Sequence, residues 1–278
     1  MKKKGNRHKT QRAHRRALKR AAIITMAGAA VIIGAYSLKV YDFRIKYTQT
    51  ADYMKGNEEN VTEGVVTYEE ATNSNQTTAA VRSSYKRLDV ECVLQNPELP
   101  TGCEITSLTE VLNYLGYGID KETLARNYLD MRDTVTQGCF VEYFWGSPWK
   151  TTGSGCFAPA IANAANSFLK SQNSSYSAYI MSYSPVEDLF TELSLGHPVI
   201  VWTSYNYNDP DVKYNDVTLD DGTVFTWPRN EHCAALSGYD IDRGVVRLAD
   251  PTYGIVERSM EEFVTYYQKY YYQAVVVR

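Results

Sequence analysis

One cysteine and its surroundings constrain this chain more than any other feature: Cys103 lies in the segment QNPELPTGCEITSLTEVLNYLG, residues 95–116. Pro and Gly residues precede it, and apolar residues at helical spacing follow it, which predicts that Cys103 begins a helix packed on a core. The unpaired N–H groups and the dipole at a helix N-terminus favour a negative charge. We therefore expect the Cys103 thiol to have a lowered pKa and to be nucleophilic near neutral pH.

Three polar residues surround this cysteine in the order that thiol catalysis requires. Gln95 precedes it; His232 follows it by 129 residues in EHCAALSGYD, and Asp250 by another 18 in LADPTYG. His232 is expected on a buried strand and Asp250 at the end of the next strand. Adjacent antiparallel strands would place the two side by side, so that Asp250 orients the imidazole and His232 serves as the base. The Cys103 N–H and the Gln95 carboxamide are the predicted oxyanion donors.

Each of these roles leaves an alternative open. A buried cysteine or histidine is often only a packed core residue. The sequence offers His197 as a second candidate base, and Asp240 and Asp242 as further orienting acids if Asp250 only caps the turn beside Pro251. Gln95 has the simpler interpretation of an ordinary loop amide.

The runs QNPELPTGCEITSL, EHCAALSGYD and ADPTYG resemble the peptidase-family-thirty-nine-like domain of Gram-positive bacteria, and GSGCFAPAIANAANSFL and GHPVIVWTS add to the likeness. That group is related to the peptidases that trim bacteriocin leaders and more distantly to papain. The resemblance covers roughly residues 86–278. It implies Cys103 as nucleophile, His232 as base, Asp250 as orienter and Gln95 as oxyanion donor. The Cys-to-His separation of 129 residues is close to the ~130–150 of papain-like enzymes.

The order of expected elements predicts an α+β fold of papain-like type, with the cysteine on a helical part and the histidine and aspartate on an antiparallel sheet. After the Cys103 helix, Asp120 is expected to cap a helix to Leu129, and Pro159 to lie in the first turn of a helix to Lys170. Capping boxes are predicted at 184–187 and 259–262. The expected strands are PVIVWTSY, an Asp-Gly hairpin in LDDGTVFTW, residues 232–239 and 244–250, and QAVVV.

The N-terminal region differs from the rest in charge. Residues 2–20 carry ten Lys and Arg and no acid, and residues 21–38 carry no charge. Removing the basic head leaves 19 Lys and Arg against 32 Asp and Glu, a net charge of −13. We expect four parts: a basic cytoplasmic head (1–20), a transmembrane anchor or signal segment (21–38), an extracytoplasmic stalk or linker (39–84) and a cysteine-peptidase-like domain (85–278).

The apolar segment sets the expected location. As a helix, its 18 residues would span about 27 Å, just short of a ~30 Å hydrocarbon core. We favour a single-pass anchor with the C-terminal domain outside the cell membrane; cleavage near Ala35 is the alternative and would give a secreted protein. The stretch 48–84 has no Leu, Ile, Phe or Trp and is typical of a linker.

Disulfides are permitted outside the membrane, and the remaining cysteines are Cys92, Cys139, Cys156 and Cys233. The favoured pairing is Cys139 with Cys156, which flank one Gly- and aromatic-rich loop; buried free thiols are the alternative. The sequence contains no C-x-x-C, H-E-x-x-H, P-loop or dinucleotide motif, so no metal or cofactor is expected.

Together these features predict a membrane-anchored extracytoplasmic cysteine hydrolase, foremost a peptidase acting on a peptide or protein through a thioester. A cell-wall peptide amidase or acyl transferase uses the same chemistry on a substrate close to a stalked domain. A surface binding module that kept the fold and lost turnover is a third hypothesis. Nucleic acid is not an expected partner, because the acidic domain would repel phosphates.

Overall fold

The computed structural model describes residues 83–133, 140–205, 207, 214–218, 222 and 224–278. The predicted head, the apolar segment and nearly all of the stalk lie outside these residues. Within the described ranges, none of the helices has the length and apolar character needed to cross a membrane.

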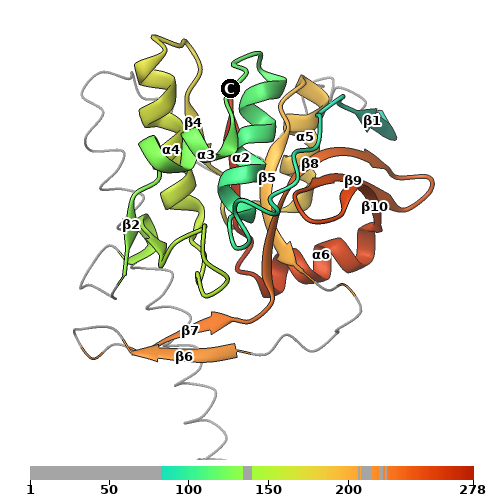
Figure 1. The fold of residues 1–278 in the computed structure, drawn as a ribbon. Helices are drawn as coiled ribbons and strands as arrows, with labels where there is room; N and C mark the ends of the chain where they lie inside the picture. The colour runs from blue at the N-terminus through green and yellow to red at the C-terminus, as the bar shows by residue number, and fades with distance from the viewer. Residues whose placement is uncertain (1–82, 134–139, 206, 208–213, 219–221, 223) are drawn as a thin grey trace, which may run out of the picture. The chain divides into compact units, whose positions relative to one another are not determined.

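A seven-stranded antiparallel sheet forms the frame of the domain (Figure 1). Its strand order is β10-β9-β8-β5-β11-β4, and β1 pairs with β8 outside this path. All six residues of β5 are buried, as expected for a strand between two neighbours. The strands are β1 (Tyr85–Arg87), β4 (Ala178–Ile180), β5 (Val199–Ser204), β8 (Glu231–Asp240), β9 (Val245–Asp250), β10 (Gly254–Ser259) and β11 (Ala274–Val277).

Helices pack against this sheet, and α2, α3 and α4 contact one another in a helical group (Figure 1). The apolar residues of α2 at helical spacing, among them Ile105, Leu108 and Leu112, are fully buried and face β8. Helix α5 packs against β8, β5 and β1, while α6 packs against β5, β9 and β10. The helices are α2 (Cys103–Tyr114), α3 (Lys121–Tyr128), α4 (Ala158–Ser171), α5 (Val186–Leu195) and α6 (Met260–Lys269).

Two short pairings complete the fold. Strands β2 (Met131–Arg132) and β3 (Phe144–Trp145) are parallel, and β6 (Tyr214–Thr218) pairs with β7 (Val224–Pro228) as the expected antiparallel hairpin. A single 3-10 turn, η1 (Phe140–Glu142), precedes β3. The predicted α+β class, with helices first and an antiparallel sheet later, is confirmed.

The helix ends mostly follow the sequence signals. Asp120 caps α3 by accepting the Thr123 N–H, and Ser259 caps α6 by accepting the Glu262 N–H. The predicted capping box at 184–187 is wrong: the N-cap of α5 is Pro185, and no side chain caps this end. The helix does end at Gly196, which adopts a left-handed φ of 98°.

The favoured disulfide is also wrong. Cys156 is a free, fully buried thiol, while Cys139 lies outside the described residues. Cys92, Cys103 and Cys233 are free as well. Cys156 sits where the chain enters α4, with its carbonyl accepting the Trp202 indole N–H at 2.8 Å, so core packing holds this segment.

Candidate active site

The candidate nucleophile begins α2, as predicted. Gly102 is the N-cap, and a Cβ there would lie 2.8 Å from the Cβ of Leu99, so the turn before the helix requires glycine. The Thr101 hydroxyl donates to the Lys150 carbonyl at 2.9 Å, which ties the turn to the loop after β3. Cys103 is 9% exposed. Its N–H lies in the first helical turn, where no intrahelical acceptor is available.

The candidate base and its orienting acid lie on neighbouring strands. His232 on β8 and Asp250 at the end of β9 are each 1% exposed, and Nε2 of the histidine lies 2.8 Å from Oδ1 of the aspartate. The same oxygen accepts the N–H groups of Thr252 at 2.8 Å and Tyr253 at 3.1 Å. The carboxylate is therefore held by three donors from the strand and the following turn.

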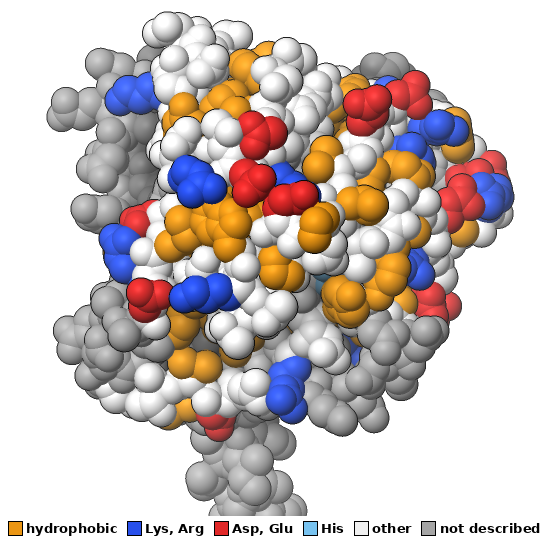
Figure 2. Space-filling view, viewed as in Figure 1, with side chains coloured by type: hydrophobic (Ala, Val, Ile, Leu, Met, Phe, Trp, Pro, Cys, Tyr) orange, Lys and Arg blue, Asp and Glu red, His pale blue; other side chains and the backbone are white. Residues whose placement is uncertain are grey.

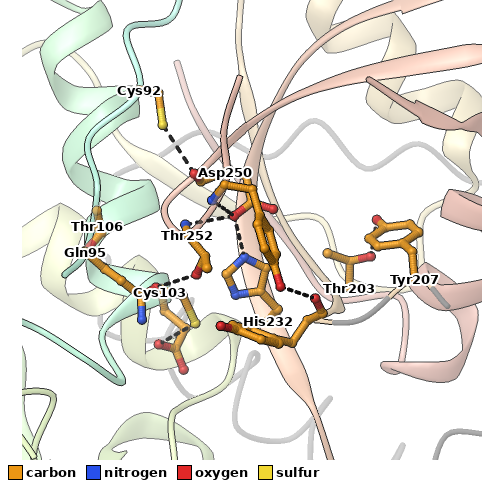
Figure 3. Close-up of polar contacts among 12 residues, drawn as sticks. Cys92, Gln95, Cys103, Thr106, Thr203, Tyr207, His232, Asp250 and Thr252 are labelled. Atoms are coloured by element: carbon orange, nitrogen blue, oxygen red, sulfur yellow. Dashed lines mark hydrogen bonds and ion pairs between the residues drawn. The ribbon is translucent and has the colours of Figure 1, made fainter. Parts of the chain in front are cut away.

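These contacts determine the ionisation of Asp250. Burial alone would raise the pKa of this carboxyl, but the hydrogen bond and charge of His232 and the two backbone N–H donors outweigh it and hold the pKa below its usual value. A charged acceptor at Nε2 places the imidazole proton there when the ring is neutral, which leaves Nδ1 as the proton acceptor. Figure 3 shows this second ring nitrogen turned toward the side on which Cys103 lies.

Gln95 is brought to the same place. It is 4% exposed, and its N–H donates to the Pro251 carbonyl at 2.8 Å, which joins its loop to the turn after Asp250. The side-chain Nε2 donates to the Pro100 carbonyl at 2.8 Å, and the Thr252 hydroxyl donates to Oε1 at 3.4 Å. The Pro100 carbonyl thus engages one of the two amide N–H bonds, and the Gln95 side chain lies on the same side of the site as Cys103 in Figure 3.

The alternative residues lie elsewhere. Nδ1 of His197 lies 2.8 Å from Oε2 of Glu192. His197 precedes β5, whereas the residue of β5 that pairs with His232 is Thr203, near the other end of the strand. Asp240 accepts the Arg243 N–H in the turn at the far end of β8, and Asp242 accepts the Ser84 hydroxyl. The structure therefore brings together Gln95, Cys103, His232 and Asp250, and none of the alternatives.

The ionisation of the cysteine differs from the prediction. The Cys103 thiol donates to Oε2 of Glu104 at 3.3 Å, and in the described part of the chain it makes no hydrogen bond to His232. Burial first, and then the negative charge of Glu104, raise the pKa of this thiol well above its usual value. The expected lowering was wrong because the helix terminus is covered by protein and faces buried acids.

Two acidic residues near the cysteine were missed by the sequence interpretation. Glu104 is 1% exposed, and its Oε1 accepts the Cys156 N–H at 2.8 Å. Both side-chain oxygens of Glu231 are buried without a hydrogen-bond partner of normal geometry, although the Trp202 and Trp227 indoles are near enough to lower its pKa in part. The signal was available for Glu104: it lies one turn before Leu108, on the apolar face of the helix. In the described residues, no group of three or more His, Cys, Asp or Glu could hold a metal ion.

A helix-borne cysteine facing a histidine and an aspartate on an antiparallel sheet defines the fold of the papain-like cysteine peptidases. The chain belongs to the Peptidase_C39-like family, whose model matches residues 87–275.

Two known proteins are similar to this chain. It is 30% identical over 207 residues to the uncharacterized protein YvpB of Bacillus subtilis, covering 71% of this chain and 78% of that one. A putative C39-like peptidase from Bacillus anthracis superposes with a TM-score of 0.61 at 26% identity, over 70% of this chain and 97% of that chain.

Proposed function

We propose that this protein is a membrane-anchored, extracytoplasmic cysteine peptidase in which Cys103 is the nucleophile. The observation that carries the proposal is the His232–Asp250 hydrogen bond, buried beside a helix-terminal cysteine in a C39-like fold. A base with a fixed tautomer next to a thiol is the arrangement that acyl transfer through a thioester needs.

The proposed reaction assigns a step to each residue. Nδ1 of His232 takes the thiol proton, and the Cys103 sulfur bonds to the peptide carbonyl carbon while the Cys103 N–H and Gln95 carboxamide hold the oxyanion. The C–N bond then breaks, and the imidazolium gives its proton to the leaving amine. Water, deprotonated by His232, attacks the thioester and releases a carboxylic acid and the thiol. Asp250 orients the ring and stabilises its charged form throughout.

The surface around the site suits a peptide better than a strongly charged ligand. The Tyr205 ring packs edge-on against His232 at 5.4 Å between centroids, and it contacts the Tyr253 ring at 5.6 Å. The two tyrosines are 44% and 48% exposed, so they offer apolar area beside the base. On the face drawn in Figure 2, hydrophobic side chains are interspersed with both acidic and basic side chains.

The location is proposed from the sequence. The basic head and the uncharged segment 21–38 favour an anchor that leaves the C-terminal domain outside the cytoplasm. Peptides, secreted proteins and cell-wall stem peptides are the substrates that such a domain would meet.

The test is proteolysis by the full-length chain, read by mass spectrometry on a peptide library and on purified cell wall. We expect cleavage of library peptides that is abolished in Cys103→Ala and falls by about 10²–10⁴-fold in His232→Ala. Release of stem peptides from wall, with the library intact, would favour the amidase instead. Equal cleavage by Cys103→Ala and the unmodified chain would refute the assignment of the nucleophile.

One observation favours a second candidate, a binding module without turnover. Burial and the charge of Glu104 hold the Cys103 thiol pKa well above its usual value, which disfavours a permanent thiolate. Binding of a peptide without any cleavage, in both the unmodified chain and Cys103→Ala, would support this candidate over the peptidase.

A further inference from the structure

The Cys103 thiol has a specific partner that the proposed reaction does not use. Its hydrogen bond goes to Oε2 of Glu104 at 3.3 Å, and the contact is drawn as the dashed line from the Cys103 sulfur in Figure 3. In the described residues the sulfur makes no such bond to His232. The nucleophile is therefore bound to an acid on its own helix rather than to the base across the site.

The Glu104 carboxylate is fixed in position. Its Oε1 accepts the Cys156 N–H at 2.8 Å, and the backbone of Gly155 passes so close that a Cβ there would lie 2.7 Å from the same oxygen. Gly155 has a left-handed φ of 105°, a second reason for glycine at this point. The chain thus closes over the carboxylate, and the Glu104 side chain has one oxygen left for the thiol.

The charges around this carboxylate oppose ionisation of the sulfur. The groups that influence Glu104 or Cys103 come from two other parts of the chain: Cys156 before α4, and Glu231, His232 and Cys233 on β8. Burial raises the pKa of the Glu104 carboxyl, and its N–H donors, the thiol and His232 offset part of this rise. Among the charged groups, Glu104 has a larger effect on Cys103 than Glu231 has.

We propose that Glu104 is a positioning residue for the nucleophile: it holds the Cys103 thiol by a hydrogen bond and opposes its ionisation in the resting protein. The role rests on the proposed function only in naming Cys103 as the nucleophile. The sulfur must leave Glu104 to give its proton to His232, so the carboxylate sets how readily the reaction starts. A negative charge also stabilises the imidazolium that forms next, which gives an acid at this place a second use.

The experiment is alkylation of Cys103 by iodoacetamide between pH 5 and 10, with the full-length chain and mass-spectrometric mapping of the labelled residue. Glu104→Gln keeps the side-chain size and an oxygen for the Cys156 N–H, but removes the charge. We expect the alkylation midpoint of Glu104→Gln to lie about one pH unit or more below that of the unmodified chain. A thermal melt of each variant checks that it is folded.

Glu231→Gln is the matched control, because it removes a buried acid of the same cluster that makes no hydrogen bond to the thiol. We expect it to move the midpoint less than Glu104→Gln does. Equal midpoints for Glu104→Gln and the unmodified chain, or a larger shift in Glu231→Gln, would overturn the proposal.

The unmodified chain supplies a test that needs no variant. A resting thiol held by Glu104 should alkylate with a midpoint above the ~8.5 of free cysteine, and a lower midpoint would also overturn the proposal. These outcomes are separate from the proposed function. If peptide cleavage depends on Cys103 but the alkylation profile of Glu104→Gln is unshifted, the peptidase proposal holds and the role of Glu104 is refuted. If the profile shifts but no peptide is cleaved, the role of Glu104 holds and the peptidase proposal is refuted.

Discussion

The two halves of the candidate site are built in opposite ways. On the sheet, the Asp250 carboxylate accepts three N–H donors, including Nε2 of His232, and its pKa is held below the usual value in spite of burial. On the helix, Cys103 faces Glu104, and burial raises the pKa of both groups. The imidazole on the sheet is oriented by a charged carboxylate, whereas the thiol on the helix is held in its protonated form.

Because their pKa values shift in opposite directions, the buried acids also make opposite contributions to the pH dependence of folding stability. A buried acid with a lowered pKa stabilises the fold above its unfolded pKa and loses this as pH falls through the folded value. A buried acid with a raised pKa has the opposite sign: its contribution is present at low pH and is lost as pH rises through the folded value. Asp250 belongs to the first kind; Glu104, Glu110 and Glu231 belong to the second.

The largest expected effect comes from breaking the half with the base. Asp250→Ala removes the acceptor that fixes the His232 tautomer, so kcat/KM for a cleaved peptide should fall by about 10²-fold or more. Asp250→Asn keeps an oxygen that can accept the Nε2 proton and should lose less. Steady-state kinetics on a peptide found by the library digest give both values. A loss of only a few-fold in Asp250→Ala would mean that the ring is oriented without this carboxylate.

A smaller effect, on folding stability, is expected from Glu110, a buried acid whose pKa is raised. Glu110 is fully buried; its Oε1 accepts the Val93 N–H at 2.9 Å, and its Oε2 has no partner of normal geometry. Burial raises the pKa of this carboxyl well above its usual value. Glu110→Gln keeps the acceptor and removes the charge, so it should raise Tm by about 3 °C or more at pH 8.

The pH dependence supplies the control for that variant. The sign requires the gain to shrink as pH is lowered, because the raised pKa of Glu110 favours its protonated form in the unmodified chain. Below about pH 4, protonation of Asp250 should destabilise both chains alike. Thermal melts of the two chains from pH 3 to 9 measure this, and a gain that is the same at pH 5 and pH 8 would contradict the assigned charge.

The sequence was sufficient for the frame of the site. The apolar spacing after Cys103 predicted a helix, and the apolar run and the turn between residues 231 and 250 predicted two neighbouring strands, because these patterns depend on local residues. The meeting of His232 with Asp250 then follows from antiparallel pairing. The roles of these residues in catalysis stay predictions until kinetics test them.

The electrostatics of the nucleophile could not be predicted in the same way. The usual pKa argument for a helix terminus assumes solvent and open N–H groups. Here Gly155 and Cys156 cover the terminus from more than 50 residues away, and Glu231 approaches from β8. The sign of the shift depends on these distant contacts. The local signal for the raised pKa was the position of Glu104, an acid on the apolar face of its helix.

The smallest expected effect concerns the exposed aromatic edge of the half with the base. The planes of the Tyr205 and His232 rings meet at 82°, and the backbone carbonyl of Tyr205 accepts a hydrogen bond from the Tyr253 hydroxyl at 3.3 Å. An edge-to-face pair is worth about 0.5–1.5 kcal/mol, so Tyr205→Ala should lower kcat/KM by roughly 2–10-fold.

Tyr205→Phe keeps the ring and should stay close to the unmodified chain in the same assay. If the ring also contacts the substrate, the loss in Tyr205→Ala should appear mainly in KM, whereas a ring that only supports His232 should change kcat. Equal losses in Tyr205→Ala and Tyr205→Phe would assign the effect to the hydroxyl instead. The alkylation midpoint of Cys103 should not move in either variant, because the nucleophile is held from the helix side by Glu104.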